Sequence, residues 1–161
     1  MKTITKTVFS LQMAAMFLSA AFASYGAASV ELPFHGRVQQ VETQIINFPF
    51  MSVEGAGTGN ASLLGRFTET FEHEVDLIAV GGIGSATFTG ANGDSISTEI
   101  TSSAGPDGTL WRVTELHTVI GGTGRFEGAT GAFTLVRYFD SITSVISSGS
   151  FDGTVVSHKA K

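Results

Sequence analysis

In Val119-Ile-Gly-Gly-Thr-Gly-Arg-Phe-Glu-Gly-Ala-Thr-Gly-Ala-Phe-Thr-Leu135, a glycine-rich turn separates two runs of strand-forming residues. A glycine-rich loop that binds phosphate is followed by a helix, whose N-terminal amides face the anion. Here the residues that follow, 132–139, are rich in β-formers and do not begin such a helix. The glycine spacing, G-x-G-x-x-x-G from Gly122, also departs from the nucleotide-binding pattern. The segment therefore predicts a β-hairpin whose glycines adopt positive φ.

Period-2 alternation of apolar and polar residues recurs after residue 28, between clusters of Gly, Asn, Asp and Ser. No helical apolar spacing is sustained, so the sequence predicts an all-β chain. Turns are expected at 91–94, 105–108 and 140–141, where Asn-Gly, Gly-Pro-Asp-Gly and Asp-Ser occur. Eight short strands suit a sandwich or a closed barrel equally well on pattern alone. The expected strands are 34–43, 45–53, 64–77, 84–90, 95–101, 109–120, 131–139 and 145–156.

The segment from Gly121 to Gly131 reads G-G-T-G-x-F-x-x-A-x-G and resembles, at every fixed position, a motif of the plant dirigent proteins. These proteins belong with the allene oxide cyclases in one β-barrel group. A second segment, Gly59 to Arg66, is similar to the G-x-x-S-x-x-G-R pattern that opens a long dirigent strand. The resemblance implies a single eight-stranded antiparallel β-barrel, often trimeric, whose lumen steers a cyclisation or a radical coupling.

The resemblance is incomplete where chemistry would be expected. Dirigent proteins commonly carry a His-Asp pair in the first strand, and the nearest equivalent here, Phe34-His35-Gly36, lacks the acid. The turn motif carries no chemistry in that family, so it supports the fold and leaves the activity open. A Ser-His-Asp order, a nucleophile elbow and a His-Glu-x-x-His helix are all missing from the sequence, which argues against hydrolases and proteases.

Residues 1–28 have the pattern of a signal peptide, with Lys2 and Lys6 before an apolar run from Val8 to Phe22. Small residues allow cleavage after Ala23 or after Ala28. The apolar run falls short of the ~20 residues that span a bilayer, which argues against a retained anchor. We therefore expect one β-barrel domain, 29–161, in a secreted or periplasmic protein.

The charge balance limits the partners. Without the two lysines of the leader, the chain carries 7 basic and 14 acidic residues, a net charge of −7. This charge argues against nucleic acid and against anionic membranes, so we expect no membrane partner once the leader is removed. The chain has no cysteine and must be held together by packing and strand pairing. No cofactor is expected.

Three expected strands place charged residues on apolar faces, because alternate residues of a strand point the same way. If these faces point into the barrel, the charged residues converge in an aromatic lumen, where unpaired charges would be costly. The other face of the 109–120 strand is nearly as apolar, so a one-residue slip would reverse its assignment. The charged residues concerned are Glu69 and His73 on 64–77, Glu115 and His117 on 109–120, and Arg137 on 131–139.

Three interpretations of these residues remain open. They form a buried network of paired charges, or an acid–base site with Glu69, His73, Glu115 and His117 as catalytic candidates, or a metal site with two histidines and a glutamate. The interpretation we adopt contains no metal. The residues expected to contact a ligand are Trp111, Arg137, Phe71 and Phe133, although the aromatic ones are also expected core residues.

We therefore expect a homo-oligomeric barrel that encloses or positions a small apolar molecule in its lumen, without established catalysis. One alternative is an isomerase or cyclase-like enzyme that uses the lumen Glu and His residues. The other is a self-assembling structural barrel with a filled lumen.

Overall fold

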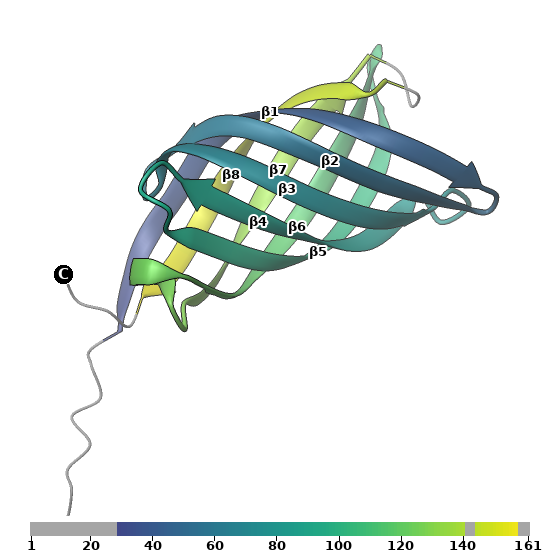
Figure 1. Ribbon diagram of the computed structural model, residues 1–161. Helices are drawn as coiled ribbons and strands as arrows, with labels where there is room; N and C mark the ends of the chain where they lie inside the picture. Colours follow the sequence, from purple (N-terminus) through teal and green to yellow (C-terminus); the bar gives the residue numbers. More distant parts are fainter. Residues whose placement is uncertain (1–28, 141–143, 158–161) are drawn as a thin grey trace, which may run out of the picture.

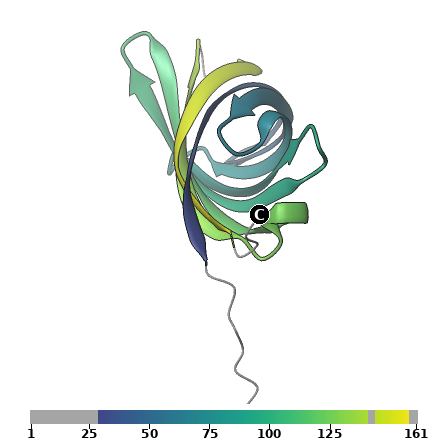
Figure 2. The ribbon, with the colours of Figure 1, turned by 90° about the vertical axis from the view of Figure 1, so that its left-hand side faces the viewer.

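The computed structural model describes residues 29–140 and 144–157, and the expected signal peptide lies outside them. Eight antiparallel strands follow one another around a closed barrel, and β1 pairs with β8 to complete it. Figure 1 shows the barrel from the side and Figure 2 shows the strands curving around it. The prediction of an all-β chain in one eight-stranded barrel is confirmed. Within the described ranges, no helix is long and apolar enough to cross a membrane.

The strands are long for a domain of this size. From β1 to β6 consecutive strands are joined by short turns, and one 3₁₀ turn, η1, lies between β6 and β7. The elements are β1 Val30–Asn47, β2 Phe50–Ala61, β3 Gly65–Asp76, β4 Gly81–Gly90, β5 Ser95–Asp107, β6 Leu110–Gly122, η1 Gly124–Phe126, β7 Thr130–Phe139 and β8 Ile146–Ser157.

The glycine-rich motif forms the expected turn between two paired strands. Gly121, Gly124, Gly128 and Gly131 all have positive φ, a region that side chains rarely tolerate. Phe126 points into the core from η1 and is buried. The hairpin prediction is confirmed, as is the tight turn at Asn92-Gly93, where Gly93 has φ +87°.

Several predicted boundaries were wrong. The strand expected at 45–53 begins inside β1, which extends from Val30 to Asn47, so the first turn lies at 48–49. Residues 54–61 belong to β2 and pair with β3 along their whole length, although Gly55, Gly57 and Gly59 weaken strand propensity. The turn expected at 105–108 lies two residues later, because Gly105, Pro106 and Asp107 remain paired with β6. In the last two cases cross-strand pairing overrides local propensity.

The glycines of β2 face the lumen, and each lies directly across from a large lumen side chain. Gly55 is paired with Phe71, Gly57 with Glu69 and Gly59 with Phe67. A Cβ at any of these glycines would collide with the paired side chain. The same arrangement recurs around the barrel, in the pairs Gly36 with Phe151, Gly84 with His73, Gly149 with Arg137 and Gly153 with Phe133. The narrow lumen therefore accommodates large side chains because their cross-strand partners have none.

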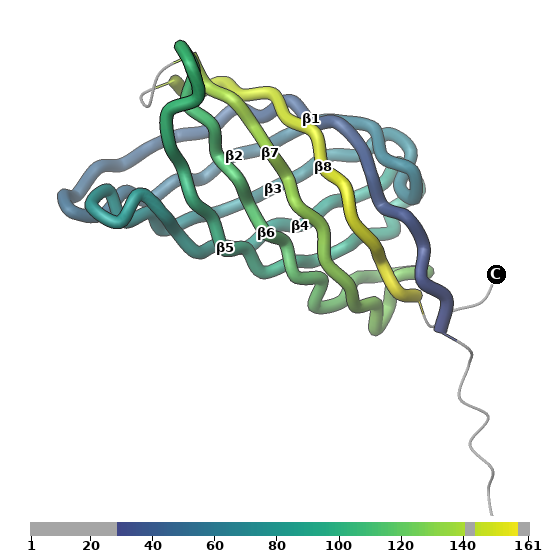
Figure 3. Tube along the Cα trace, turned by 180° about the vertical axis from the view of Figure 1, so that it is seen from behind, coloured from purple at the N-terminus to yellow at the C-terminus, as the bar shows by residue number. Residues whose placement is uncertain are grey.

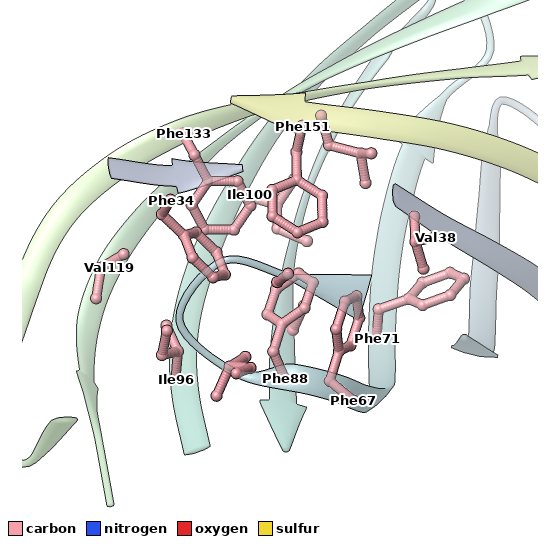
Figure 4. Packing of buried hydrophobic residues seen from close by; sticks show 14 of the residues in the cluster. Phe34, Val38, Phe67, Phe71, Phe88, Ile96, Ile100, Val119, Phe133 and Phe151 are labelled. Atoms are coloured by element: carbon pink, nitrogen blue, oxygen red, sulfur yellow. The ribbon is translucent and has the colours of Figure 1, made fainter. Parts of the chain in front are cut away.

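A phenylalanine cluster fills the half of the lumen nearest to the start of β1 and the end of β8. Its rings meet edge-on or tilted, with the centroids of Phe34 and Phe133 5.0 Å apart and those of Phe88 and Phe133 5.5 Å apart. Figure 4 shows these side chains converging from strands all around the barrel. The cluster consists of Phe34, Phe67, Phe88, Phe133 and Phe151, with Ile96, Ile100 and Val119 beside them. This half of the barrel is therefore a packed core.

Replacement of Phe88 by alanine should lower the free energy of unfolding by about 3–5 kcal/mol, because the ring is fully buried among four other rings. Urea denaturation would measure the change. Ile83→Ala on the same strand is the control, because Ile83 is 65% exposed and its loss should cost less than about 0.5 kcal/mol. A cost below about 1 kcal/mol for Phe88→Ala would show that the cluster is not the packed core described here.

Candidate functional site

A polar layer crosses the lumen beside the phenylalanine cluster. Its side chains come from six strands and face inward, and none is more than 7% exposed. All five residues that the sequence places on apolar faces belong to it, so these faces point into the barrel, a direction that the sequence alone left open. The opposite face of β6 is the solvent face, as the exposed Leu116 and Ile120 show. The polar layer consists of Gln40, Glu42, Glu69, His73, Thr98, Glu115, His117, Arg137 and Ser147.

Arg137 is the centre of this layer. Its Nε donates to Glu115 Oε1 at 2.7 Å, and its Nη1 donates to Glu42 Oε2, also at 2.7 Å. The guanidinium also lies over the rings of Phe71 and Phe139, 5.4 and 4.9 Å from their centroids. One buried cation is thus held between two carboxylates and two aromatic faces, an arrangement that compensates its desolvation.

Arg137 sets the charge of its neighbours. Burial alone would raise the pKa of Glu115, but the adjacent guanidinium outweighs it and lowers that pKa to about 2. Burial likewise would lower the pKa of Arg137, whereas Glu115 and Glu42 raise it. Glu115 and Arg137 therefore remain an ion pair throughout the physiological pH range.

His117 is enclosed by two polar partners and a stacked aromatic ring. Its Nδ1 lies 3.0 Å from Thr98 Oγ1, and its Nε2 lies 3.4 Å from Glu115 Oε2. The ring stacks on Phe133 at a centroid distance of 4.5 Å, and it is fully buried. Because both ring nitrogens have partners and no ligand space adjoins it, His117 joins the polar layer to the phenylalanine cluster.

His73 is placed differently. Its Nδ1 lies 3.9 Å from Glu115 Oε1, and its Nε2 has no hydrogen-bond partner among the described residues. Burial lowers the pKa of His73, and the charge of Glu115 offsets only part of this effect. The imidazole is therefore neutral at pH 7. With Nδ1 directed at a carboxylate, the proton belongs on Nδ1, which leaves the lone pair of Nε2 free to accept.

Glu69 continues the layer on the side of the phenylalanine cluster. Gln40 Nε2 donates to Glu69 Oε2 at 2.8 Å, and Gln40 Oε1 accepts from Ser147 Oγ at 3.3 Å. Ser147 in turn accepts a 3.4 Å bond from Arg137 Nη1, which connects Glu69 to the ion pair. Burial raises the pKa of Glu69 to about 7, although the bond from Gln40 lowers it. Its Oε1 has no partner among the described residues.

A pocket of about 150 Å³ lies on the other side of the polar layer, toward the β1–β2 and β3–β4 turns. Its polar floor is formed by Glu42, His73 and Arg137. Its walls are almost entirely apolar and come from β2, β3, β5, β6 and β7. The wall residues are Met51, Val53, Val75, Leu77, Val80, Ala104, Trp111, Val113 and Phe139, with Gln44, Gly81 and Ser102 beside them.

The pocket separates the predicted site residues into two groups. His73, Trp111 and Arg137 line it, whereas Phe71 and Phe133 lie in the hydrophobic core and Glu69, Glu115 and His117 lie below the floor. The sequence reasoning missed Gln40, Glu42, Thr98 and Ser147. Gln40 and Glu42 share a face with Phe34 and Val38, a signal that could have revealed them, but the exposed Val41 and Ile45 make the opposite face equally apolar.

The metal interpretation receives no support from the described residues, among which no group of three or more His, Asp or Glu side chains could hold a metal ion. The hydrogen bonds give a physical reason. Glu115, the carboxylate nearest to both His73 and His117, already uses one oxygen for Arg137 and the other for His117. The paired charges of the layer are those of Arg137 with Glu115 and Glu42.

No protein-family model and no curated protein matches the chain. Among solved structures, it is similar to the pterocarpan synthase dirigent protein GePTS1, with a TM-score of 0.63. The two chains are 14% identical over 95% of this chain and 100% of the other. At this identity the likeness shows the fold alone. The chain thus has a dirigent-like β-barrel fold, as the motif from Gly121 to Gly131 implies.

Glu69 should make the stability of the barrel depend on pH. Its pKa is about 7 in the folded protein and close to 4.5 in the unfolded chain, so the unfolded chain loses this proton first as the pH rises. The free energy of unfolding should therefore fall between about pH 4.5 and pH 7 and then level off, for a total loss of about 3 kcal/mol from this group.

The variant Glu69→Gln removes this titration and keeps the shape of the side chain. It should match the wild type near pH 4 and exceed it by about 2–3 kcal/mol at pH 8 in urea denaturation. Glu72→Gln, an exposed position on the same strand, is the control. An equal effect of Glu69→Gln at both pH values would contradict the raised pKa.

Proposed function

We propose that the barrel binds a small apolar molecule in the pocket above the polar layer. The observation that carries this proposal is a pocket with apolar walls and three polar side chains grouped on its floor. Such a combination is typical of sites that bind by apolar burial and orient the ligand by a few polar contacts. Export of the chain and its self-association remain predictions from the sequence.

The polar floor limits which charged groups a ligand can carry. Arg137 is already paired with both Glu115 and Glu42, so it has little capacity left for an anionic ligand. The binding energy must therefore come mainly from the apolar walls. The similar barrel GePTS1 is named as a pterocarpan synthase, which is consistent with a lumen of this fold that receives a small organic molecule.

Filling the pocket should abolish binding. The neutral fluorescent probe N-phenyl-1-naphthylamine should bind the wild type, and Ala104→Phe should reduce its affinity at least about 10-fold, because Ala104 lines the pocket. Ser103→Phe is the matched control, since Ser103 is the exposed neighbour on β5. Fluorescence titration measures both variants. If the probe does not bind the wild type, or if both variants bind equally well, the pocket is not the binding site.

A second candidate function is proton transfer to or from the bound molecule. It is favoured by one observation: His73 is a lining residue of the pocket, its buried Nε2 has no hydrogen-bond partner among the described residues, and its Nδ1 lies 3.9 Å from Glu115 Oε1. A neutral histidine oriented by a carboxylate is a common general base. Because Arg137 keeps Glu115 ionised, the carboxylate can stabilise an imidazolium that forms on His73.

NMR titration of the imidazole nitrogens tests this arrangement without a substrate. The pKa of His73 should lie below 6.5, and Glu115→Gln should lower it further, because the charge of Glu115 raises it. His73→Gln assigns the signals, and circular dichroism checks that each variant is folded. A pKa of 6.5 or above for His73, or a rise in the Glu115→Gln variant, would rule out the proposed orientation.

A further inference from the structure

Exposed apolar side chains gather at the pocket end of the barrel. Phe48 is 73% exposed, Ile78 69% and Ile45 67%, although other large apolar residues of the same strands are buried. We call this surface the tip patch. It consists of Val41, Ile45, Ile46, Phe48, Phe50, Ile78, Val145 and Ile146.

The members of the tip patch lie on neighbouring strand ends and turns. Five of its members belong to β1, β2 and the turn between them, and the β3–β4 turn is attached by a 2.9 Å bond from Leu77 N to the carbonyl of Pro49. On the other flank, Val41 is the cross-strand partner of Ile146. Figures 1 and 3 show the β1–β2 and β3–β4 turns side by side at one extremity of the molecule.

The position of the tip patch relates it to the pocket. Ile78 lies between Leu77 and Val80, which both line the pocket, and Ile46 is paired with Met51, another lining residue. The apolar wall of the pocket therefore continues onto the exposed patch. Exposed apolar side chains gathered in this way mark a site of interaction, since packing of the barrel does not require them.

The charges near the tip patch indicate which kind of partner could bind there. None of its eight residues is charged, and Asp76, the nearest acid on β3, is engaged by the backbone amides of Ile78 and Ala79. A surface without cations does not attract anionic lipid or an acidic protein. Projecting Phe and Ile side chains on adjacent turns can enter the outer part of a lipid layer without a shaped counterpart, as apolar residues of interfacial segments do.

We propose that the tip patch docks the barrel on a neutral, zwitterionic lipid surface and brings the mouth of the pocket against the apolar layer. A small apolar ligand could then pass between lipid and pocket without crossing water. The expectation of no membrane partner was drawn from net charge, and it concerned anionic surfaces. The tip patch acts instead through burial of apolar area, which net charge does not report.

Flotation with phosphatidylcholine vesicles tests this proposal. The sample is the protein purified from its own cells, after any processing that occurs there. The wild type should float with the vesicles, and the double variant Phe48→Ser/Ile78→Ser should lose at least about 10-fold in vesicle partitioning, because both side chains project from the patch. The matched control is Leu116→Ser/Ile120→Ser. It removes two residues of 50% and 58% exposure from the outer face of β6 and should float like the wild type.

Three results of the flotation experiment would overturn the proposal. They are a wild type that does not float, an equal loss in the control variant, and flotation that requires an anionic lipid such as phosphatidylglycerol. Sedimentation velocity without lipid tests whether a second copy of the chain binds the tip patch instead. If Phe48→Ser/Ile78→Ser converts an oligomer to a monomer, the tip patch belongs to a second copy of the chain and the lipid proposal fails. Neither measurement depends on probe binding in the pocket.

Discussion

The contact of Arg137 with Glu115 and Glu42 is the interaction on which the interior of this barrel depends. It keeps Glu115 ionised, and Glu115 is the carboxylate that both His73 and His117 face. Loss of the guanidinium would leave two buried carboxylates without a cation, a change that typically costs about 3–5 kcal/mol. The same contact fixes Glu42 at the floor of the pocket. The stability of the polar layer and the candidate chemistry of His73 therefore both depend on Arg137.

The lumen is divided along its length into a packed aromatic half, a polar layer and an apolar pocket. An eight-stranded barrel is only wide enough to be filled by side chains or to hold one small ligand. Here both occur in one barrel, because the phenylalanine cluster closes one end and the pocket occupies the other. The polar layer separates them, and three of its residues, Glu42, His73 and Arg137, line the pocket.

The sequence predicted the fold class and which residues of β3, β6 and β7 share a face, because two-residue periodicity and the motif from Gly121 to Gly131 are local signals. It left open which of the two faces points into the barrel, since a one-residue slip reverses that assignment. It did not predict the full length of β2, whose inward glycines look like turn residues until the side chains across from them are known. Nor did it identify Glu42, because the exposed Val41 and Ile45 make the opposite face of β1 equally apolar. Nor did the sequence reveal the tip patch, because its members are separated along the chain, from Val41 to Ile146.

The pairing of lumen glycines with large side chains constrains how this sequence can diverge. A larger residue at Gly55 is tolerated only if Phe71 shrinks at the same time, because an added Cβ would meet the ring of Phe71. This pair can also be inverted, so that the bulk comes from the other strand while the volume is conserved. At Gly153 an added Cβ would also meet the backbone of Ala132 and Phe133, so a smaller side chain at Phe133 does not make room for it. Related barrels should therefore show correlated exchanges at positions 55 and 71, where the shape of the lumen should change by the whole pair rather than by a single residue.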